Sequence, residues 1–253
     1  MTTVDTLSRP FSIGTVFQKT FYVVGRGIIP IFFVTALMNT PLLLLGLTST
    51  RFIGAPSSSA AYFAASANLL NYVLGIVAQG ILIFGAFRVL QGGTFDIGTS
   101  ANRVFRRAFS LIGLAIVTAF AIGLGFLLLV IPGLIVATMF MIAVPACLVE
   151  SKGVFASLKR SRLLTKGYRW QTFGIFFLMM LLSFALIFGL SFVIGLVLGA
   201  SGAISRLYIS VIGQFIGGII SGGIQSVIVA VIYSELRYVK EGVGIDEIAN
   251  VFA

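Results

Sequence analysis

Six long apolar runs constrain the fold of this chain more than any other feature. A helix of about 20 apolar residues spans the hydrocarbon core of a bilayer. Closed β-barrels also span membranes, but their strands alternate between apolar and polar residues, whereas these runs are apolar throughout. We therefore predict an all-α fold, a polytopic bundle of six transmembrane helices. The predicted spans are Ile28–Leu47, Asn68–Val89, Leu111–Ile131, Leu134–Val149, Thr172–Leu198 and Leu207–Tyr233.

The composition agrees with a membrane protein. Hydrophobic residues make up 58% of the chain and charged residues 9%, whereas a soluble domain keeps about 25% of its residues charged. A chain of 253 residues has room for a single integral membrane domain. The one cysteine, Cys147, lies within an apolar run. It predicts a small buried side chain rather than a disulfide or a metal site.

The basic residues are distributed unevenly between the two ends of the predicted spans. Of the 17 Lys and Arg residues, only Arg51 and Arg206 fall on one side. The positive-inside rule therefore places the other side, with both termini, in the cytoplasm. Because these cations lie beside spans, we expect anionic lipid headgroups as partners, at about 1 kcal/mol for each exposed cation, and no nucleic acid. The candidate lipid contacts are Lys19, Arg26, Arg103, Arg106, Arg107, Lys159, Arg160 and Lys166.

A near-repeat precedes the first two pairs of spans. The segment FSIGTVFQKTF begins at Phe11, and FDIGTSANRVF begins at Phe95. Each fits an amphipathic helix capped by Ser12 or Asp96, as expected of helices that lie at a membrane interface. A third, weaker copy of this pattern begins at Val154. We expect three units of cytoplasmic interfacial helix plus hairpin, at roughly 11–90, 95–150 and 153–240, followed by a cytoplasmic tail at 241–253. Duplication and convergence on a common solution both account for the similarity.

Two interpretations of the first interfacial helix stay open. Its apolar seam lies either in the acyl region of the lipid, with Lys19 and Arg26 at the headgroups, or against protein beneath the membrane. The predicted seam is Ile13, Val16, Phe17, Thr20, Phe21 and Val24.

The fourth run is short and contains proline. It is entered through Pro132-Gly133 and includes Pro145. Since proline removes a backbone donor and crowds the preceding turn, we expect the third and fourth spans to form a tight, bent hairpin.

Amides and glycines supply the polarity within the spans. Interhelical hydrogen bonds, worth about 0.6–2 kcal/mol each, are the favoured interpretation of the amides, and the lining of a polar cavity is the alternative. The candidate polar face is Asn68, Asn71, Gln79, Gln214 and Gln225. Glycines four residues apart permit close helix approach, within the chain or between copies. The candidate packing seam is Gly213, Gly217, Gly218 and Gly222.

The side chains that carry most chemistry are missing from the spans. All seven acidic residues lie at or beyond the span ends, and the chain has no histidine. Ion-coupled transporters usually keep an ionisable group at mid-membrane, and hydrolases need a general base. We therefore expect neither such a pump nor an enzyme, and no cofactor or metal. Glu150 and Glu235 are expected to pair with neighbouring cations.

Two stretches resemble a known family. PGLIVATMFMIAVPACLVESKGVFASLKRSRLLTKGYRW (Pro132–Trp170) and YSELRYVKEGVGIDEIA (Tyr233–Ala249) are similar to the bacterial glycerophosphoryl diester phosphodiesterase membrane-domain family. The resemblance implies a stand-alone inner-membrane protein. It implies no phosphodiesterase activity, because the soluble catalytic domain of some relatives has no counterpart here.

Two functions fit these features. The first is a non-catalytic inner-membrane module that assists assembly, with itself or a partner membrane protein, or organises lipid. The second is a permeation protein or a transporter of lipids and other amphiphiles, lined by the Asn and Gln residues.

Overall fold

The computed structural model describes residues 11–48, 57–150, 153–198 and 203–242. This part of the chain forms nine helices and contains no strand. Six segments are long and apolar enough to span a membrane, so the predicted all-α, multi-pass membrane fold is confirmed. The helices are α1 (Ile13–Thr48), α2 (Ser57–Leu90), α3 (Ile97–Arg106), α4 (Ala108–Leu128), α5 (Val130–Phe140), α6 (Ala143–Glu150), α7 (Val154–Thr165), α8 (Arg169–Leu198) and α9 (Ala203–Glu241).

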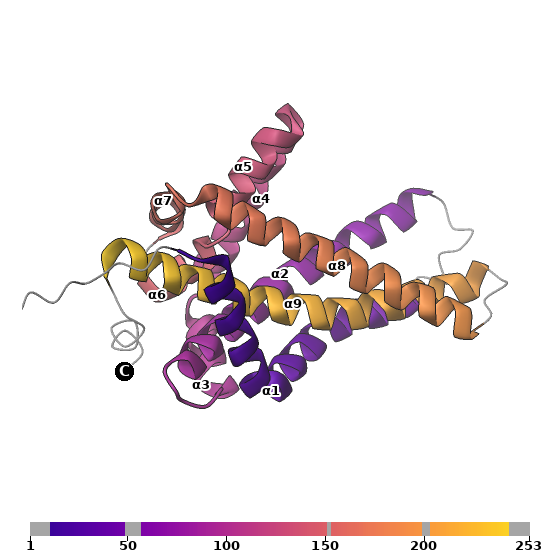
Figure 1. Cartoon of the computed structure of the whole chain (residues 1–253). Helices are drawn as coiled ribbons and strands as arrows, with labels where there is room; N and C mark the ends of the chain where they lie inside the picture. Colours follow the sequence, from indigo (N-terminus) through magenta and orange to yellow (C-terminus); the bar gives the residue numbers. More distant parts are fainter. Residues whose placement is uncertain (1–10, 49–56, 151–152, 199–202, 243–253) are drawn as a thin grey trace, which may run out of the picture.

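Four long helices form the body of the bundle. The central helix is α9, which packs against α1, α2 and α8, while α1 also packs against α2. The hairpin of α4 and α5 projects away from these helices (Figure 1). The short helices α3, α6 and α7 gather at one end of the bundle. A short helix followed by a hairpin therefore occurs at α3–α6 and again at α7–α9, and duplication stays a prediction.

The first amphipathic segment is the beginning of α1 rather than a separate helix. Non-helical backbone at Gly27 (φ −110°, ψ 18°) kinks α1 and sets this segment at an angle to the apolar part. Its buried face follows Val16, Thr20 and Val23, which are at most 1% exposed. Two residues of the predicted seam, Ile13 and Phe21, are 40% and 66% exposed. Protein therefore covers only part of that seam, and lipid contact for the rest stays a prediction. The buried residues, at i, i+4 and i+7, form a stripe that is rotated by part of a turn from the predicted seam, because this face packs against protein.

The hairpin of α4 and α5 is as tight as the sequence predicts. The turn is made by the extended residue Leu129, and Pro132 lies in the first turn of α5, where no intrahelical donor is needed. A Cβ on Gly125 would lie 2.9 Å from the Cα of Gly133, so side chains at this contact would separate the two helices. The predicted fourth span is divided between α5 and α6 just before Pro145, because proline cannot continue the hydrogen bonds of the preceding turn.

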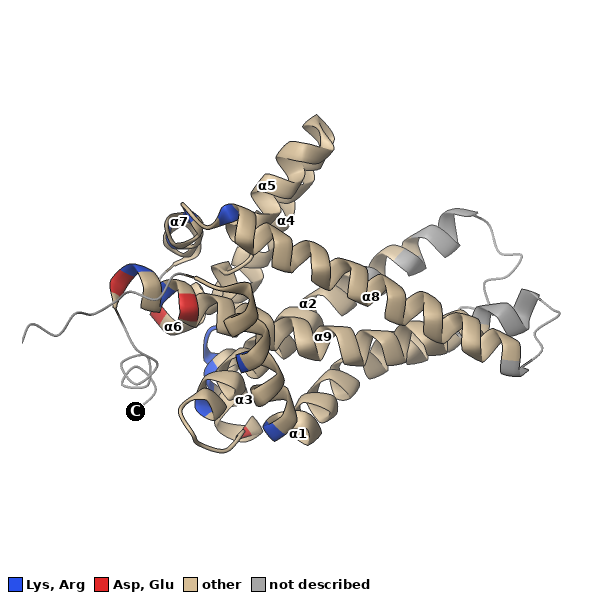
Figure 2. Cartoon of the chain, in the orientation of Figure 1, with Lys and Arg blue, Asp and Glu red and all other residues tan. Residues whose placement is uncertain are grey.

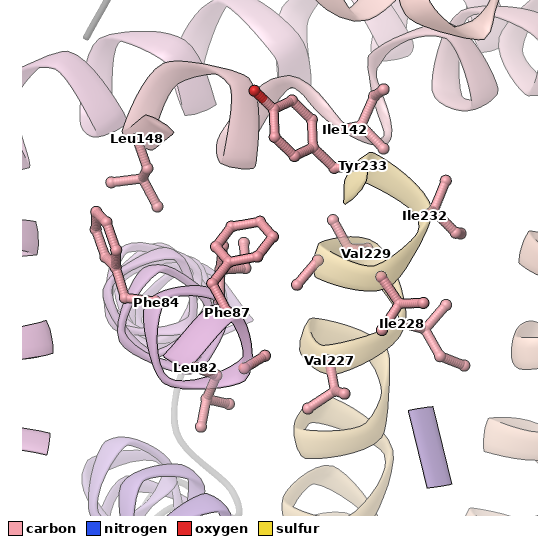
Figure 3. Packing of buried hydrophobic residues seen from close by; sticks show 14 of the residues in the cluster. Leu82, Phe84, Phe87, Ile142, Leu148, Val227, Ile228, Val229, Ile232 and Tyr233 are labelled. Atoms are coloured by element: carbon pink, nitrogen blue, oxygen red, sulfur yellow. The ribbon is translucent and has the colours of Figure 1, made fainter. Parts of the chain in front are cut away.

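The apolar core lies in the half of the bundle near the short helices. It joins the second half of α2, α6 and the second half of α9, where every residue from 226 to 236 is buried. Figure 3 shows Phe87 and Tyr233 facing each other across this core, with ring centroids 6.0 Å apart in an edge-to-face arrangement. The close packing holds α2 and α9 together at this end.

The charged residues whose side chains the structure describes gather at the same end (Figure 2). Glu235 of α9 pairs with Lys19 of α1, and Glu150 of α6 pairs with Arg160 of α7. The predicted pairing of both glutamates is confirmed. Arg160 also donates to Glu241 of α9 over 2.7 Å. Burial alone would lower the pKa of Arg160, but its hydrogen bonds to Glu241 and Glu150 raise it overall.

These ion pairs join α1, α6, α7 and α9 at the charged end of the bundle. We call the five residues that form them the clasp (Lys19, Glu150, Arg160, Glu235, Glu241). The Tyr233 hydroxyl adds a hydrogen bond of 3.1 Å to Glu150. Two of the candidate lipid contacts, Lys19 and Arg160, are therefore engaged within the protein.

The remaining candidate lipid contacts differ in exposure. Arg107 donates to the Leu148 carbonyl over 3.0 Å at the end of α6, which is again a contact within the protein, and Arg103 is half-buried. The exposed candidates are Arg26, Arg106, Lys159 and Lys166.

Candidate functional site: a polar pocket between the spans

A half-open pocket of about 300 Å³ lies between α1, α2 and α9. Gln79 and Gln225 lie near the middle of their apolar segments, Ala65–Leu90 and Tyr208–Glu241. The pocket is therefore at the depth of the hydrocarbon core. Its lining residues are Thr35, Asn39, Asn71, Tyr72, Gly75, Ile76, Ala78, Gln79, Leu82, Gly218, Gly222, Gln225 and Ser226.

Helical spacing brings the polar side chains of α2 to this pocket. Asn71, Gly75 and Gln79 are each four residues apart, so they share one face of α2. Across the pocket, Gln225 and Gly222 are three residues apart on α9, and both line it. A Cβ on Gly75 or Gly222 would meet no atom within 4 Å. These glycines therefore leave open space between the amides.

The polar groups of α1 and the Ser226 hydroxyl are satisfied within their own helices. The Asn39 amide donates to the Thr35 carbonyl over 2.8 Å, and the Thr35 hydroxyl donates to the Ile31 carbonyl over 2.8 Å. The Ser226 hydroxyl donates to the Gly222 carbonyl over 2.8 Å. Hydrogen bonds of this kind leave acceptor atoms, such as the Asn39 side-chain oxygen, turned toward other partners.

The three amides of α2 and α9 differ from these groups. In the described part of the chain, Asn71, Gln79 and Gln225 make no hydrogen bond to another residue. The favoured sequence interpretation, hydrogen bonds between helices, stays a prediction for them, and the alternative of a polar cavity lining fits the pocket that they border. On the facing helix, Gly218 and Gly222 line the same pocket and offer no side chain to bond.

The pocket is suited to uncharged groups that form hydrogen bonds. An amide presents two donors and an acceptor with two lone pairs, and the lining contains no Asp, Glu, Lys or Arg among the described residues. An unsatisfied polar group in hydrocarbon costs several kcal/mol. Water or the polar part of a ligand would remove that cost, so the site selects uncharged hydroxyl, carbonyl or amide groups.

The other predicted polar residues do not all reach the pocket. Gln214 is exposed and does not line it, because it lies eleven residues before Gln225, three turns along α9. The side chain of Asn68 lies outside the described residues. Sequence reasoning missed Asn39 and Ser226, although a single Asn within the first apolar run was a visible signal. It also missed Tyr72, whose ring is hard to distinguish from a lipid-facing aromatic.

The glycines of the α9 seam have two roles, because some pack against a neighbouring helix and others line the pocket. A Cβ on Gly213 would lie 2.5 Å from the Ser191 hydroxyl, and one on Gly217 would lie 2.8 Å from Ile187, so these two glycines pack against α8. A Cβ on Gly218 would lie 3.4 Å from the Asn39 side-chain oxygen of α1, and Gly222 lines the pocket without close contact. The tight contact with α1 is made instead by the next glycine along the chain, Gly223.

Comparison of the chain with protein-family models, with curated proteins and with solved structures finds no match. The pocket and the sequence therefore carry the functional assignment.

Proposed function

We propose that this chain is a non-catalytic, multi-pass protein of the bacterial inner membrane that binds and organises lipid through the polar pocket. The observation that carries the proposal is the convergence of Asn71, Gln79 and Gln225 on one pocket within the spans, where none of them bonds to another residue of the described chain. Three amides in this position have a stabilising role only when they meet polar groups from outside the chain.

A lipid fits this pocket better than an ion does. No charged side chain of the described residues lines the pocket, whereas ion pathways usually depend on one. Gln225 is exposed and also borders a hollow of about 320 Å³ between α8 and α9. A molecule dissolved in the bilayer would therefore reach the amides from the side, without crossing the headgroup layer.

The charged end of the molecule supports the cytoplasmic placement of both termini. Exposed cations such as Arg106, Lys159 and Lys166 would meet anionic headgroups there. The Pro132–Trp170 and Tyr233–Ala249 stretches support membership of the glycerophosphoryl diester phosphodiesterase membrane-domain family.

Lipid analysis of the purified protein tests the proposal. The protein is extracted in mild detergent, and the lipid bound per chain is measured by native mass spectrometry for the wild type and for Gln79→Leu with Gln225→Leu. Leucine keeps the approximate size but removes the hydrogen bonds. Loss of two bonds of about 0.6 kcal/mol or more each corresponds to roughly tenfold weaker binding.

Gln214→Leu is the matched control, because Gln214 is an exposed amide on the same helix outside the pocket. We expect it to retain lipid as the wild type does. Equal lipid content in the double variant and the control would contradict the proposal, provided that both melt at the wild-type temperature.

A further inference from the structure

A second, larger space lies beside the polar pocket. This groove, of about 750 Å³, runs between α2 and α4. Its walls are apolar, with Leu69 and Val73 on α2 and Ile116, Phe120 and Leu127 on α4. The groove exists because the hairpin of α4 and α5 diverges from the rest of the bundle (Figure 1).

The groove and the polar pocket share part of their lining. Tyr72 and Ile76, one turn apart on α2, line both. The Tyr72 hydroxyl donates to the Ala115 carbonyl of α4 over 3.1 Å, which holds the ring at the junction. The amide-rich pocket and the apolar groove therefore adjoin at these two residues.

The lining residues of the two spaces are complementary to an uncharged amphiphile. No charged side chain of the described residues lines the groove or the pocket. The charged residues whose side chains are described gather at the end of the bundle with the short helices (Figure 2). A phosphate at mid-span would be buried without a counter-charge, which is strongly unfavourable. Each space also has a volume in the range of about 300–1,000 Å³ that is typical of ligand sites.

We propose that the pocket and the groove together hold one uncharged lipid of the diacylglycerol class. Its hydroxyl and ester groups meet Asn71, Gln79 and Gln225, and one acyl chain lies along α2 and α4. Tyr72 is the positioning residue at the junction. This inference rests on the proposed function, and it adds the chemical class of the lipid and the place of its chain.

Photolabelling tests the inference directly. The full-length protein, in nanodiscs of zwitterionic lipid, is irradiated with a dioleoylglycerol analogue that carries a diazirine in one acyl chain, and the labelled peptides are mapped. We expect label on 69–76 and 112–127. Unlabelled dioleoylglycerol should reduce the labelling about tenfold, whereas dioleoyl phosphatidylglycerol, with the same chains and a charged headgroup, should not. Equal competition by both lipids would overturn the selection for an uncharged headgroup.

Filling the groove separates this inference from the proposed function. Ala119→Phe with Gly123→Leu places side chains in the groove, since both residues line it and a Cβ on Gly123 meets no atom within 4 Å. Ala185→Phe, at an exposed position of α8, is the control. We expect about tenfold less labelling in the first variant and wild-type labelling in the control.

If the filled groove labels as the wild type does while Gln79→Leu with Gln225→Leu loses labelling, the inferred chain position is overturned and the polar pocket stands. If neither variant changes the labelling, the inference is overturned, and the lipid content measured by native mass spectrometry decides the proposed function separately. Melting temperatures of all variants are measured first, so that a folding defect is not read as a loss of binding.

Discussion

At the scale of single residues, two glycines of the packing seam on α9 have different roles. Gly217 faces α8, and a Cβ there would lie 2.8 Å from the Ile187 side chain and 3.6 Å from its Cα. Gly222 lines the polar pocket, and a Cβ there would meet no atom within 4 Å. The sequence pattern alone makes the two equivalent.

We therefore expect Gly217→Leu to destabilise the protein and Gly222→Ala to be tolerated. Overpacking of a close contact costs about 1–3 kcal/mol, and Leu at position 217 would force α8 and α9 apart. Thermal unfolding in detergent, followed by circular dichroism, measures the difference. The same melting temperature for both variants would show that α8 and α9 do not depend on this contact.

The cap of α3 makes a prediction about pH. The pKa of Asp96 is lowered, first because the Thr99 hydroxyl donates to it over 2.9 Å and then through the backbone of Thr99 and Gly98 and the Arg88 side chain. A lowered pKa means that the ionised carboxylate stabilises the fold. This stabilisation is complete above the ordinary pKa of Asp, about 3.9, and is lost as the pH falls through the lowered value.

We expect α3 to loosen in acid, at a pH below the ordinary pKa of Asp. An environment-sensitive dye on Asn102→Cys, in a Cys147→Ala background, reports the change between pH 6 and pH 2. Asp96→Asn is the control, because Asn also caps helices but does not ionise as Asp does. A dye response in acid of equal size in the Asn variant would rule out Asp96 as the titrating group.

At the scale of elements, the clasp bears on how the first part of α1 is held. Val16, Thr20 and Val23 are buried, and Lys19 pairs with Glu235. Of the two interpretations left open by the sequence, protein contact therefore describes this face. The exposed Phe21 lies on another side of the helix, where lipid remains available to it.

A double-mutant cycle measures the clasp. Glu235 is 8% exposed, so removal of its partner leaves a buried carboxylate without a counter-charge. We expect Lys19→Met to lower stability by about 1–3 kcal/mol in the wild type and by much less in a Glu235→Gln background. Additive effects of the two substitutions would mean that the pair is not coupled.

Lipid composition provides a second test of the same element. A helix held by protein contacts should not respond to headgroup charge, whereas one held by headgroups should loosen in neutral lipid. A spin label at the exposed Gln18 should therefore show equal depth in anionic and zwitterionic nanodiscs. A shift outward in zwitterionic lipid would restore the headgroup interpretation.

At the scale of the whole molecule, charge and packing coincide. The short helices, the apolar core and the charged residues with described side chains occupy the same end of the bundle (Figure 2). At the other end α1 and α8 still pack closely on α9, since a Cβ on Gly46 would lie 2.8 Å from Val211 and one on Gly213 would lie 2.5 Å from Ser191. Room for lipid is left instead between α2 and α4, where the apolar groove lies.

The orientation is tested by cysteine accessibility in intact cells. In a Cys147→Ala background, a membrane-impermeant reagent should label Ser58→Cys from outside and fail to label Asn250→Cys, because the positive-inside rule places the termini in the cytoplasm. The opposite pattern would invert the topology. Labelling of both positions after the cells are opened is the control for reactivity.

The number of spans, the grouping of charge and the Asp96 cap were all predictable from the sequence. Each depends on local composition: an apolar run partitions into a bilayer whatever its neighbours are, and a capping carboxylate bonds to donors two and three residues away. The break before Pro145 was predictable as a bend for the same reason, because proline acts on its own turn.

The site was decided by the tertiary structure. Asn71, Gln79 and Gln225 reach one pocket, and Gln214 does not, although all four are amides in apolar runs. Their orientation depends on the rotation of each helix about its axis and on the contacts of Gly213, Gly217 and Gly223 with other helices. The same rotation moves the buried face of the first helical segment onto Val23 and away from Phe21. Periodicity tells which residues share a face of one helix, but only the packing of all the helices determines what that face meets.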